Sequence, residues 1–239
     1  MHWGWIAAAI GAALVVAYGF IVWMRVAHSI EMSKPLIKAA TSYEQHPSHP
    51  SMRILVAGDS TGVGVGAKDK RDSIAGRLGA HFPDADITNI SHSGDTLADL
   101  KKILDAHSAE GYDLVLLQIG ANDITGRTSY AEIKKGLQSV LARAHMLGKK
   151  VIVMTSGDVG LSPAFLWPLS AYFGHRTRVV RSIFIGETSA QGHTTYVDLF
   201  KAAKDEIFNT DIPRYYASDH FHPSGAGYGV WFEALRSAL

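Results

Sequence analysis

The chain opens with an apolar run that contains no charged side chain from Trp3 to Met24. As a helix these 22 residues would reach about 33 Å at ~1.5 Å per residue, enough to cross a hydrocarbon core of about 30 Å. Tryptophans stand at both ends, and Arg25 follows the second end, as is typical of anchors at a membrane interface. The pattern predicts one N-terminal transmembrane helix, with residues 1–26 as the anchor.

A cleaved signal peptide is the main alternative for this segment. No Lys or Arg precedes the apolar run, and the run exceeds the usual h-region of about 7–15 residues, so a retained single-pass anchor is favoured. Arg25, Lys34 and Lys38 follow the run, whereas only His2 and the terminal amine precede it. The positive-inside rule alone would make the rest of the chain cytoplasmic. Because the difference in charge is small, the side of the membrane stays open.

The next segment, residues 27–51, mixes polar residues with Pro and His, as in the Glu-Gln-His-Pro-Ser-His-Pro sequence of residues 44–50. This composition is typical of a linker. The remaining residues, 52–239, have a length suited to one domain with its own core. The sequence therefore predicts an anchor, a linker and a single domain.

Within residues 52–239, short runs rich in Val, Ile and Leu alternate with longer segments of helical pattern. Such alternation predicts an α/β fold, here a three-layer α/β/α sandwich around a five-stranded parallel sheet. The expected strands are residues 53–57, 86–90, 114–119, 151–155 and 195–197. The expected helices are residues 73–81, 96–107, 129–147, a stretch within 165–189, and 225–239.

The composition excludes several classes of protein and of site. A formal net charge of +1 with 19% charged residues lacks the basic excess of a nucleic-acid-binding protein. The chain has no Cys, which excludes disulfides, thiolate metal sites and a cysteine nucleophile. It has 12 His, but no H-E-x-x-H or comparable ligand spacing. We therefore expect neither a metal nor a cofactor.

Open parallel sheets bind ligands at the carboxyl ends of their strands. Three segments with unusual residues follow predicted strands, and a fourth lies near the C-terminus. These segments are Gly58-Asp59-Ser60-Thr61-Gly62, Ser91-His92-Ser93-Gly94-Asp95, Gly120-Ala121-Asn122-Asp123 and Asp219-His220-Phe221-His222-Pro223.

In this order and spacing, the four segments resemble the blocks of the SGNH hydrolase family, also called GDSL esterases and lipases. The segment around Ser60 resembles the nucleophile block, and Gly94 resembles the oxyanion glycine. Residues 120–123 resemble the GxND block, and residues 219–222 the DxxH block. Thr61 stands where the family name has Leu, at a position that supplies no chemistry. The resemblance implies a flavodoxin-like three-layer fold and a carboxylic ester hydrolase.

The residue types fit that chemistry. A serine hydroxyl needs a base, and a histidine needs a carboxylate to hold its tautomer, which assigns Ser60 as nucleophile with His222 and Asp219. The resemblance implies an oxyanion hole made by the backbone N–H groups of Ser60 and Gly94 and the side chain of Asn122. By the same reading, Asp59 orients the nucleophile loop, and Asp123 braces the loop of Asn122.

A dinucleotide-binding protein is a hypothesis from another class, because Gly62, Gly64 and Ala67 satisfy G-x-G-x-x-A shortly after a predicted strand. Against it, residues 68–71 are Lys-Asp-Lys-Arg where an apolar helix should begin. The glycines are more consistent with a loop beside the nucleophile.

The substrate is left open by the sequence. Apolar and aromatic side chains in residues 161–173 suggest an acyl-binding wall, with ordinary core packing as the alternative. A membrane anchor favours lipid esters such as lysophospholipids, and a carbohydrate O-acetylesterase is the alternative within the same fold. If the anchor is only a tether, removal of about the first 40 residues should leave an active, soluble domain.

Overall fold

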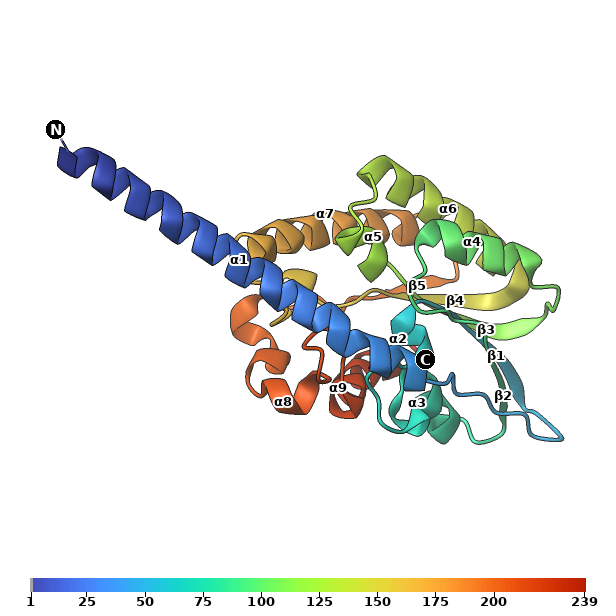
Figure 1. Ribbon diagram of the computed structural model, residues 1–239. Helices are drawn as coiled ribbons and strands as arrows, with labels where there is room; N and C mark the ends of the chain where they lie inside the picture. The colour runs from blue at the N-terminus through green and yellow to red at the C-terminus, as the bar shows by residue number, and fades with distance from the viewer. Residues whose placement is uncertain (1) are drawn as a thin grey trace.

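The computed structural model describes residues 2–239, so Met1, the first residue of the predicted anchor, lies outside the described part. Five parallel strands form one sheet in the order β2-β1-β3-β4-β5 (Figure 1). The strands are β1 (Met52–Gly58), β2 (Ala85–Asn89), β3 (Tyr112–Gln118), β4 (Gly148–Met154) and β5 (Thr194–Val197). The predicted α/β class and five-stranded parallel sheet are therefore confirmed.

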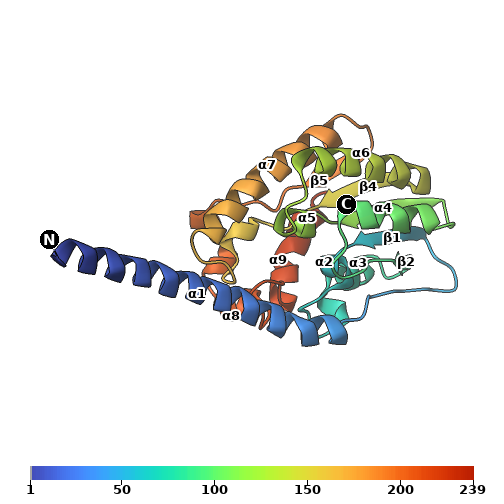
Figure 2. The same ribbon diagram turned by 45° about the horizontal axis from the view of Figure 1, so that its top comes forward.

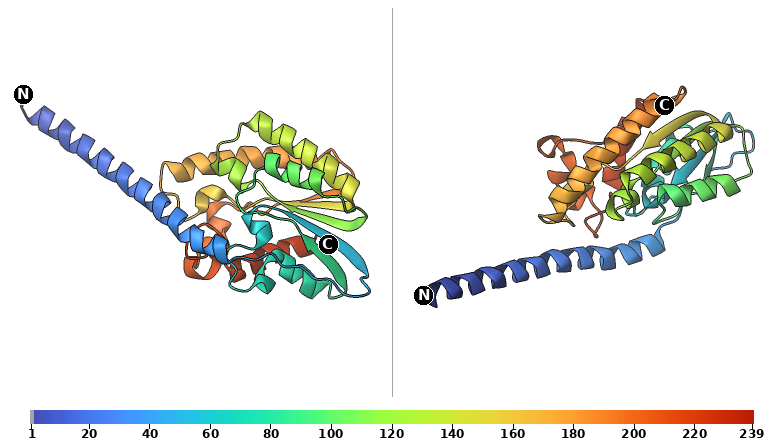
Figure 3. Two further views of the ribbon diagram at one scale, coloured as in Figure 1. Left: turned by 45° about the vertical axis from the view of Figure 1, so that its right-hand side comes forward. Right: turned by 90° about the horizontal axis from the view of Figure 1, so that it is seen from above.

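Helices cover both faces of this sheet (Figure 3). The long helices of the domain are α3 (Ile74–His81), α4 (Leu97–Ala106), α6 (Tyr130–Leu147), α7 (Leu169–Ser189) and α9 (Gly225–Arg236). Leu55 and Val115 share a buried cluster with α4, α6 and α7, whereas Ile54 and Leu116 share one with α3 and α9. Since neighbouring strand residues point to opposite faces, strands covered on both faces must be apolar throughout. This is why the three central strands, β1, β3 and β4, contain continuous Val, Ile and Leu runs, whereas the edge strands β2 and β5 include polar residues.

The strand order determines where a site can form. The chain leaves β1 toward β2 on one side and later returns to pair β3 on the other, so the order reverses between β1 and β3. A crevice forms at such a reversal, outside the carboxyl ends of the strands. Two short helices begin there, α2 (Ser60–Val63) directly after β1 and α5 (Ala121–Thr125) directly after β3.

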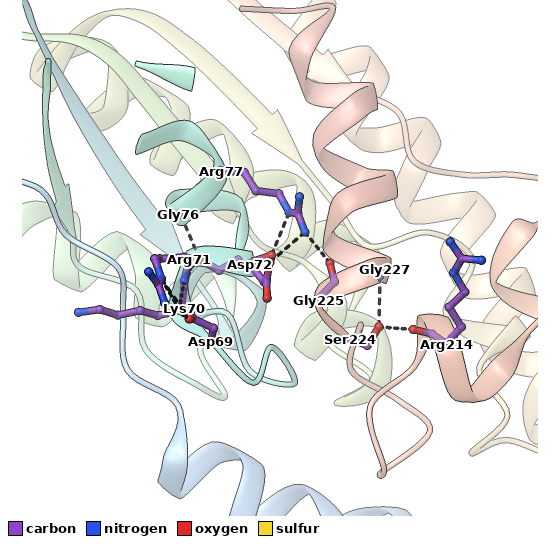
Figure 4. Close-up of polar contacts among 11 residues, drawn as sticks. Asp69, Lys70, Arg71, Asp72, Gly76, Arg77, Arg214, Ser224, Gly225 and Gly227 are labelled. Carbon is purple, nitrogen blue, oxygen red and sulfur yellow. Dashed lines mark hydrogen bonds and ion pairs between the residues drawn. The ribbon is translucent and has the colours of Figure 1, made fainter. Parts of the chain in front are cut away.

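Short helical elements fill the remaining connections, and α9 is tied to α3. They are η1 (Lys70–Asp72), η2 (Val159–Leu161), η3 (Ala203–Asp205), η4 (Ile207–Asn209) and α8 (Ile212–Tyr215). Arg77 of α3 donates from Nη2 to the Gly225 carbonyl at 2.9 Å, and Ser224 caps α9 by accepting from Gly227 N at 3.3 Å (Figure 4). The start of α9 is thereby fixed against α3.

The N-terminal helix α1 runs from His2 to Ala39, 38 residues in all. Its first half projects away from the domain, and its second half runs alongside it (Figures 1 and 2). Of the described helices, this one is long and apolar enough to cross a membrane by length and composition, a test that a signal sequence also passes. The predicted span therefore lies in the first part of a longer helix.

The predicted linker of residues 27–51 differs from the observed structure. Its first part, to Ala39, continues α1, because this stretch is rich in helix-forming residues and is held on the domain by side-chain contacts described below. Pro35 lies inside the helix and lacks the N–H that would bond to the Glu31 carbonyl, so the helix continues past it with one backbone hydrogen bond fewer. The rest is extended and attached to the sheet, since Gln45 and Ile87 exchange two backbone hydrogen bonds of 3.1 and 2.7 Å.

Candidate active site

The four segments singled out in the sequence meet at the carboxyl edge of the sheet. Ser60, Gly94, Asn122 and His222, one residue from each segment, all line a single pocket of about 460 Å³. We call it the apolar pocket, because aliphatic and aromatic side chains form most of its remaining wall. Segments that are up to 162 residues apart in the chain are thus brought to one place.

Within this site, Ser60, His222 and Asp219 form a hydrogen-bonded chain. His222 Nε2 lies 2.9 Å from Ser60 Oγ, and His222 Nδ1 lies 2.5 Å from Asp219 Oδ2. A carboxylate can only accept, so the proton of the neutral imidazole sits on Nδ1 and leaves the Nε2 lone pair toward the serine hydroxyl. All three residues are buried. In this arrangement His222 can accept a proton from Ser60, and Asp219 can stabilise the resulting imidazolium.

The turn after β1 presents Ser60 to the pocket. A Cβ at Gly58 would lie 1.9 Å from the Gln118 carbonyl oxygen of β3, so only glycine fits where the chain leaves the sheet. Asp59 then caps α2 by accepting from Thr61 N at 2.9 Å. Ser60 is therefore the first residue of a helical turn that starts at the edge of the sheet.

A closed turn holds Asp219 and His222 in register. Asp219 Oδ1 accepts the backbone N–H groups of Phe221 and His222, each at 3.0 Å. Burial by itself would raise the pKa of the Asp219 carboxyl, but its hydrogen bond and charge interaction with His222 outweigh burial and lower that pKa, with help from the Phe221 N–H. Asp219 is thus held as a carboxylate, the form that a histidine partner needs.

The predicted oxyanion donors also border the pocket. Gly94 has φ of +94°, and a Cβ there would meet no other described atom within 4 Å, so the backbone is open to the pocket. Asn122 Nδ2 donates to the Asp95 carbonyl at 2.9 Å. An amide nitrogen carries two N–H groups, so one remains to bind a ligand oxygen.

Most of the chain, including all four site segments, matches a known protein family. Residues 56–230 match the GDSL-like Lipase/Acylhydrolase family. The chain belongs to this family of carboxylic ester hydrolases. The predicted relationship is confirmed, although the family match by itself does not assign roles to single residues.

The relatives of this GDSL-family chain described here share 30% or less of its residues. It is 30% identical over 132 residues to the GDSL-like esterase Rv1075c of Mycobacterium tuberculosis, a match that covers 53% of the chain and 41% of that protein. A lipolytic G-D-S-L protein of Veillonella parvula shares the fold with a TM-score of 0.62 at 17% identity, covering 79% of this chain and 98% of that one. Axe2, an acetylxylan esterase of Geobacillus stearothermophilus, has a TM-score of 0.59 at 24% identity, with coverages of 79% and 94%.

Sequence reasoning missed two residues of α1 that reach the site of this GDSL-family chain. Ser29 Oγ donates to the Asp219 carbonyl at 2.7 Å, and Ser33 Oγ donates to Asp219 Oδ2 at 2.8 Å. The Ser33 bond helps to lower the pKa of Asp219. No motif marks these serines, because they lie in the predicted linker and contact a residue more than 180 positions away.

A buried arginine was missed as well. Arg176 of α7 donates to the carbonyls of Asp123, Ile124 and Thr128 at 2.7 to 3.1 Å. Asp123 Oδ2 accepts from Leu97 N at 3.0 Å, which ties the loop of Asn122 to α4. Asp123 thus makes a contact of the kind predicted, with α4. Arg176 holds the same loop from α7.

The loop that suggested dinucleotide binding has another role in this GDSL-family fold. Gly62 and Gly64 are buried, and a Cβ at either would lie 2.3 to 2.5 Å from Ser91 or Ser73. A Cβ at Gly66 would lie 2.3 Å from the Pro223 carbonyl oxygen, next to the turn of His222. These glycines allow close packing beneath the site, a role that involves no pyrophosphate.

A second cavity, of about 60 Å³, also borders Ser60 and His222. Its other walls include Asp158 and Glu206, and burial raises the pKa of both carboxyls. Ser156, whose Oγ is buried without a hydrogen-bond partner among the described residues, lines it too. We call it the small cavity, because its volume is a fraction of that of the apolar pocket. Among residues 2–239 there is no group of three or more His, Asp or Glu side chains arranged to hold a metal.

Asp59 gives a prediction about stability. Burial raises the pKa of its carboxyl from 3.8 to about 6. Between these values the folded chain binds a proton that the unfolded chain has lost, so this contribution to stability falls as pH rises through that window. We expect Asp59→Asn to stabilise the protein above pH 6 by up to about 3 kcal/mol, since a tenfold change in acid dissociation is worth ~1.4 kcal/mol.

Thermal unfolding of both proteins in detergent, from pH 4 to pH 8, measures this effect. The two unfolding temperatures should lie closest near pH 4 and separate as the pH rises to about 6. Asp205→Asn, at an exposed carboxylate, is the matched control and should show no such separation. A constant difference between Asp59→Asn and the parent chain at every pH would contradict the prediction.

Proposed function

We propose that this chain is a membrane-anchored serine esterase with a Ser60–His222–Asp219 triad. The observation that carries the proposal is the buried hydrogen-bonded chain from Ser60 Oγ through His222 to Asp219. Family membership makes the reaction an ester hydrolysis, and this chain of hydrogen bonds supplies a nucleophile, a base and a carboxylate in the required order.

In the first half of the reaction, Ser60 Oγ attacks the ester carbonyl carbon while His222 Nε2 takes the hydroxyl proton. The tetrahedral intermediate collapses, and the alcohol leaves with the proton from Nε2. Water then attacks the acyl-serine ester, giving its proton to Nε2, and the acid is released as Ser60 recovers its proton. Asp219 stays ionised throughout and stabilises the imidazolium that forms in each half.

The negative charge on the carbonyl oxygen needs donors already in place. We propose the backbone N–H groups of Ser60 and Gly94 and the free N–H of Asn122. A donor of this kind contributes about 2.7–4 kcal/mol to lowering the barrier. The hydrogen bond from Asn122 to the Asp95 carbonyl supports the role, because it restrains the amide beside the pocket before any substrate binds.

Work on the related fold supports the triad. In Axe2, substitutions of one serine, one aspartate and one histidine are described as catalytic mutants, and that aspartate precedes the histidine by three positions. Asp219 and His222 have the same spacing.

The first half of α1 supports the membrane location. Its side chains are exposed almost throughout, and apolar surface of this extent is stable when covered by lipid. Trp23 and Arg25, where the apolar run ends, are residue types that are common at the interface between membrane and water. A lysophospholipase-like activity is consistent with this location.

The small cavity favours a second candidate, an O-acetylesterase acting on carbohydrate. A space of about 60 Å³ holds only a few atoms, since one water needs ~10–15 Å³. An acetyl group would fit beside Ser60, and hydroxyl groups of a sugar could bond Ser156 and the carboxyls of Asp158 and Glu206. The likeness to the fold of Axe2 accords with this alternative.

Labelling with diethyl p-nitrophenyl phosphate tests the proposed nucleophile. An activated serine should displace one p-nitrophenolate per chain and keep the diethyl phosphate, which mass spectrometry should find on the peptide with Ser60. The Ser60→Ala chain is the control and should release none. Ester hydrolysis that persists while Ser60 stays unlabelled, or label on a different residue, would overturn the assignment.

A further inference from the structure

The second half of α1 is bound to the active site at several points. Besides the hydrogen bonds of Ser29 and Ser33 to Asp219, Arg25 Nε donates to the Pro163 carbonyl at 2.9 Å. Just before this half begins, Tyr18 OH donates to the Trp167 carbonyl at 2.8 Å. The helix is therefore fixed both to the turn of the triad and to the loop of residues 162–168. A simple tether would need neither set of contacts.

One face of this helical segment lines the apolar pocket. The residues that do so follow one another at the three- and four-residue spacing of a single helix face. They are Val26, Ser29, Ile30, Ser33, Lys34 and Ile37. The serines hold the triad turn, and the aliphatic residues face the same pocket as Ser60. Lys34 is paired with Glu31 at 2.5 Å, so its charge already has a partner.

The facing walls of the pocket are also apolar. They are built from the side chains Phe165, Leu169, Phe173 and Phe221. Even with both walls in place, Ile30 is 54% and Ile37 is 41% exposed. Aliphatic surface that faces an aromatic wall and is still open to solvent gains free energy when an apolar ligand covers it, at about 25 cal/mol per Å².

The direction of the pocket follows from the helix that forms its wall. Val26 lies two residues past the apolar run, or ~3 Å along the axis, which is the level where the hydrocarbon core ends. Ser33, at the level of Asp219, lies ~14 Å past the run. Trp167, 67% exposed on the loop that Tyr18 binds, stands on the membrane side of the site. An acyl chain can thus lie along α1 from the bilayer to Ser60.

We infer that the second half of α1 is a wall of the substrate site, and that the pocket it closes holds the acyl chain of an ester taken from the bilayer. This inference rests on the proposed serine esterase function and goes beyond it by making α1 part of the substrate site and by assigning the place of the acyl chain. The ester carbon lies at Ser60, and the chain runs between Ile30 and the aromatic wall toward the membrane.

The same contacts change the expectation for a truncated protein. Removal of the first 40 residues would take away Ser29, Ser33 and the aliphatic wall along with the membrane span. The anchor is in this sense part of the enzyme.

The test uses the full chain in phosphatidylcholine vesicles. Ile30→Trp places a large side chain in the pocket, and His28→Trp, at an exposed position outside the pocket lining, is the matched control. Two substrates are compared, p-nitrophenyl palmitate dissolved in the bilayer and p-nitrophenyl acetate in solution. We expect Ile30→Trp to lower the ratio of palmitate to acetate kcat/KM by about tenfold or more, and His28→Trp to leave the ratio unchanged. Ile37→Trp repeats the test at a second position of the wall.

The outcomes separate this inference from the function on which it rests. If the parent chain hydrolyses esters and Ser60→Ala does not, but Ile30→Trp and Ile37→Trp keep the parent ratio, the inference is wrong and the esterase stands. An equal loss on both esters would also overturn it, because the wall would then serve the site without regard to chain length. If hydrolysis survives Ser60→Ala, the proposed function itself fails, and the inference with it.

Discussion

Replacement of Ser60 by Ala should lower kcat for ester hydrolysis by about four to six orders of magnitude, the loss seen when a triad nucleophile is removed. The attacking oxygen is lost, and water has no position from which His222 can activate it equally well. The fold should survive, because among the described residues the Ser60 hydroxyl bonds to His222 alone. The measurement is the initial rate with p-nitrophenyl butyrate, together with the unfolding temperature.

Ser139→Ala provides the matched control for this experiment. Ser139 is a half-buried serine on α6, and its hydroxyl bonds to the Lys135 carbonyl one helical turn earlier. Its removal should leave both the rate and the unfolding temperature unchanged. A Ser60→Ala chain that keeps more than about a tenth of the parent activity would show that the reaction does not pass through this hydroxyl.

Asp219→Asn is expected to lower kcat by about four orders of magnitude. An amide that turns its N–H₂ toward His222 Nδ1 forces the imidazole proton onto Nε2, where it faces Ser60 and can no longer accept the hydroxyl proton. The new side chain also cannot stabilise the imidazolium. Asn can keep the Oδ1 hydrogen bonds from the Phe221 and His222 N–H groups, so the turn should stay closed.

Two readouts distinguish this electrostatic role from a structural one. The rate of labelling of Ser60 by diethyl p-nitrophenyl phosphate should fall in parallel with kcat, while the unfolding temperature changes little. Asp205→Asn, at an exposed carboxylate of η3, should affect neither. A loss of less than tenfold in Asp219→Asn would mean that the carboxylate is not the partner on which the base depends.

The three central strands were predictable because most of their residues are buried on both faces. Predicted strand 114–119 corresponds to Tyr112–Gln118, and predicted strand 151–155 to Gly148–Met154. The error is largest where β4 begins, because Lys149 and Lys150 are polar and carry no apolar signal, yet they follow β3 in register. Backbone pairing, which is independent of side-chain polarity, extends the strand there.

Some contacts of the site could be predicted from the sequence and others could not. Asp59 with Ser60, and Asp219 with His222, are neighbours in the chain, so their local geometry is encoded in short segments that the sequence displays. Arg176 bonds to the Asn122 loop at positions 48 to 53 residues away in the chain, and no local sequence pattern indicates these contacts. Long contacts of this kind depend on how whole elements pack.

The sequence alone determined the α/β class, the apolar N-terminal span and the four segments that meet at the sheet edge, because each depends on periodicity or on residues close together in the chain. Only the tertiary structure decided the path of residues 27–39. Their helix-forming residues are interrupted by Pro35, and the segment is held as a helix here because Ser29 and Ser33 bond to Asp219 and the aliphatic face covers the pocket. The stabilisation comes from a surface that exists only once the domain has folded.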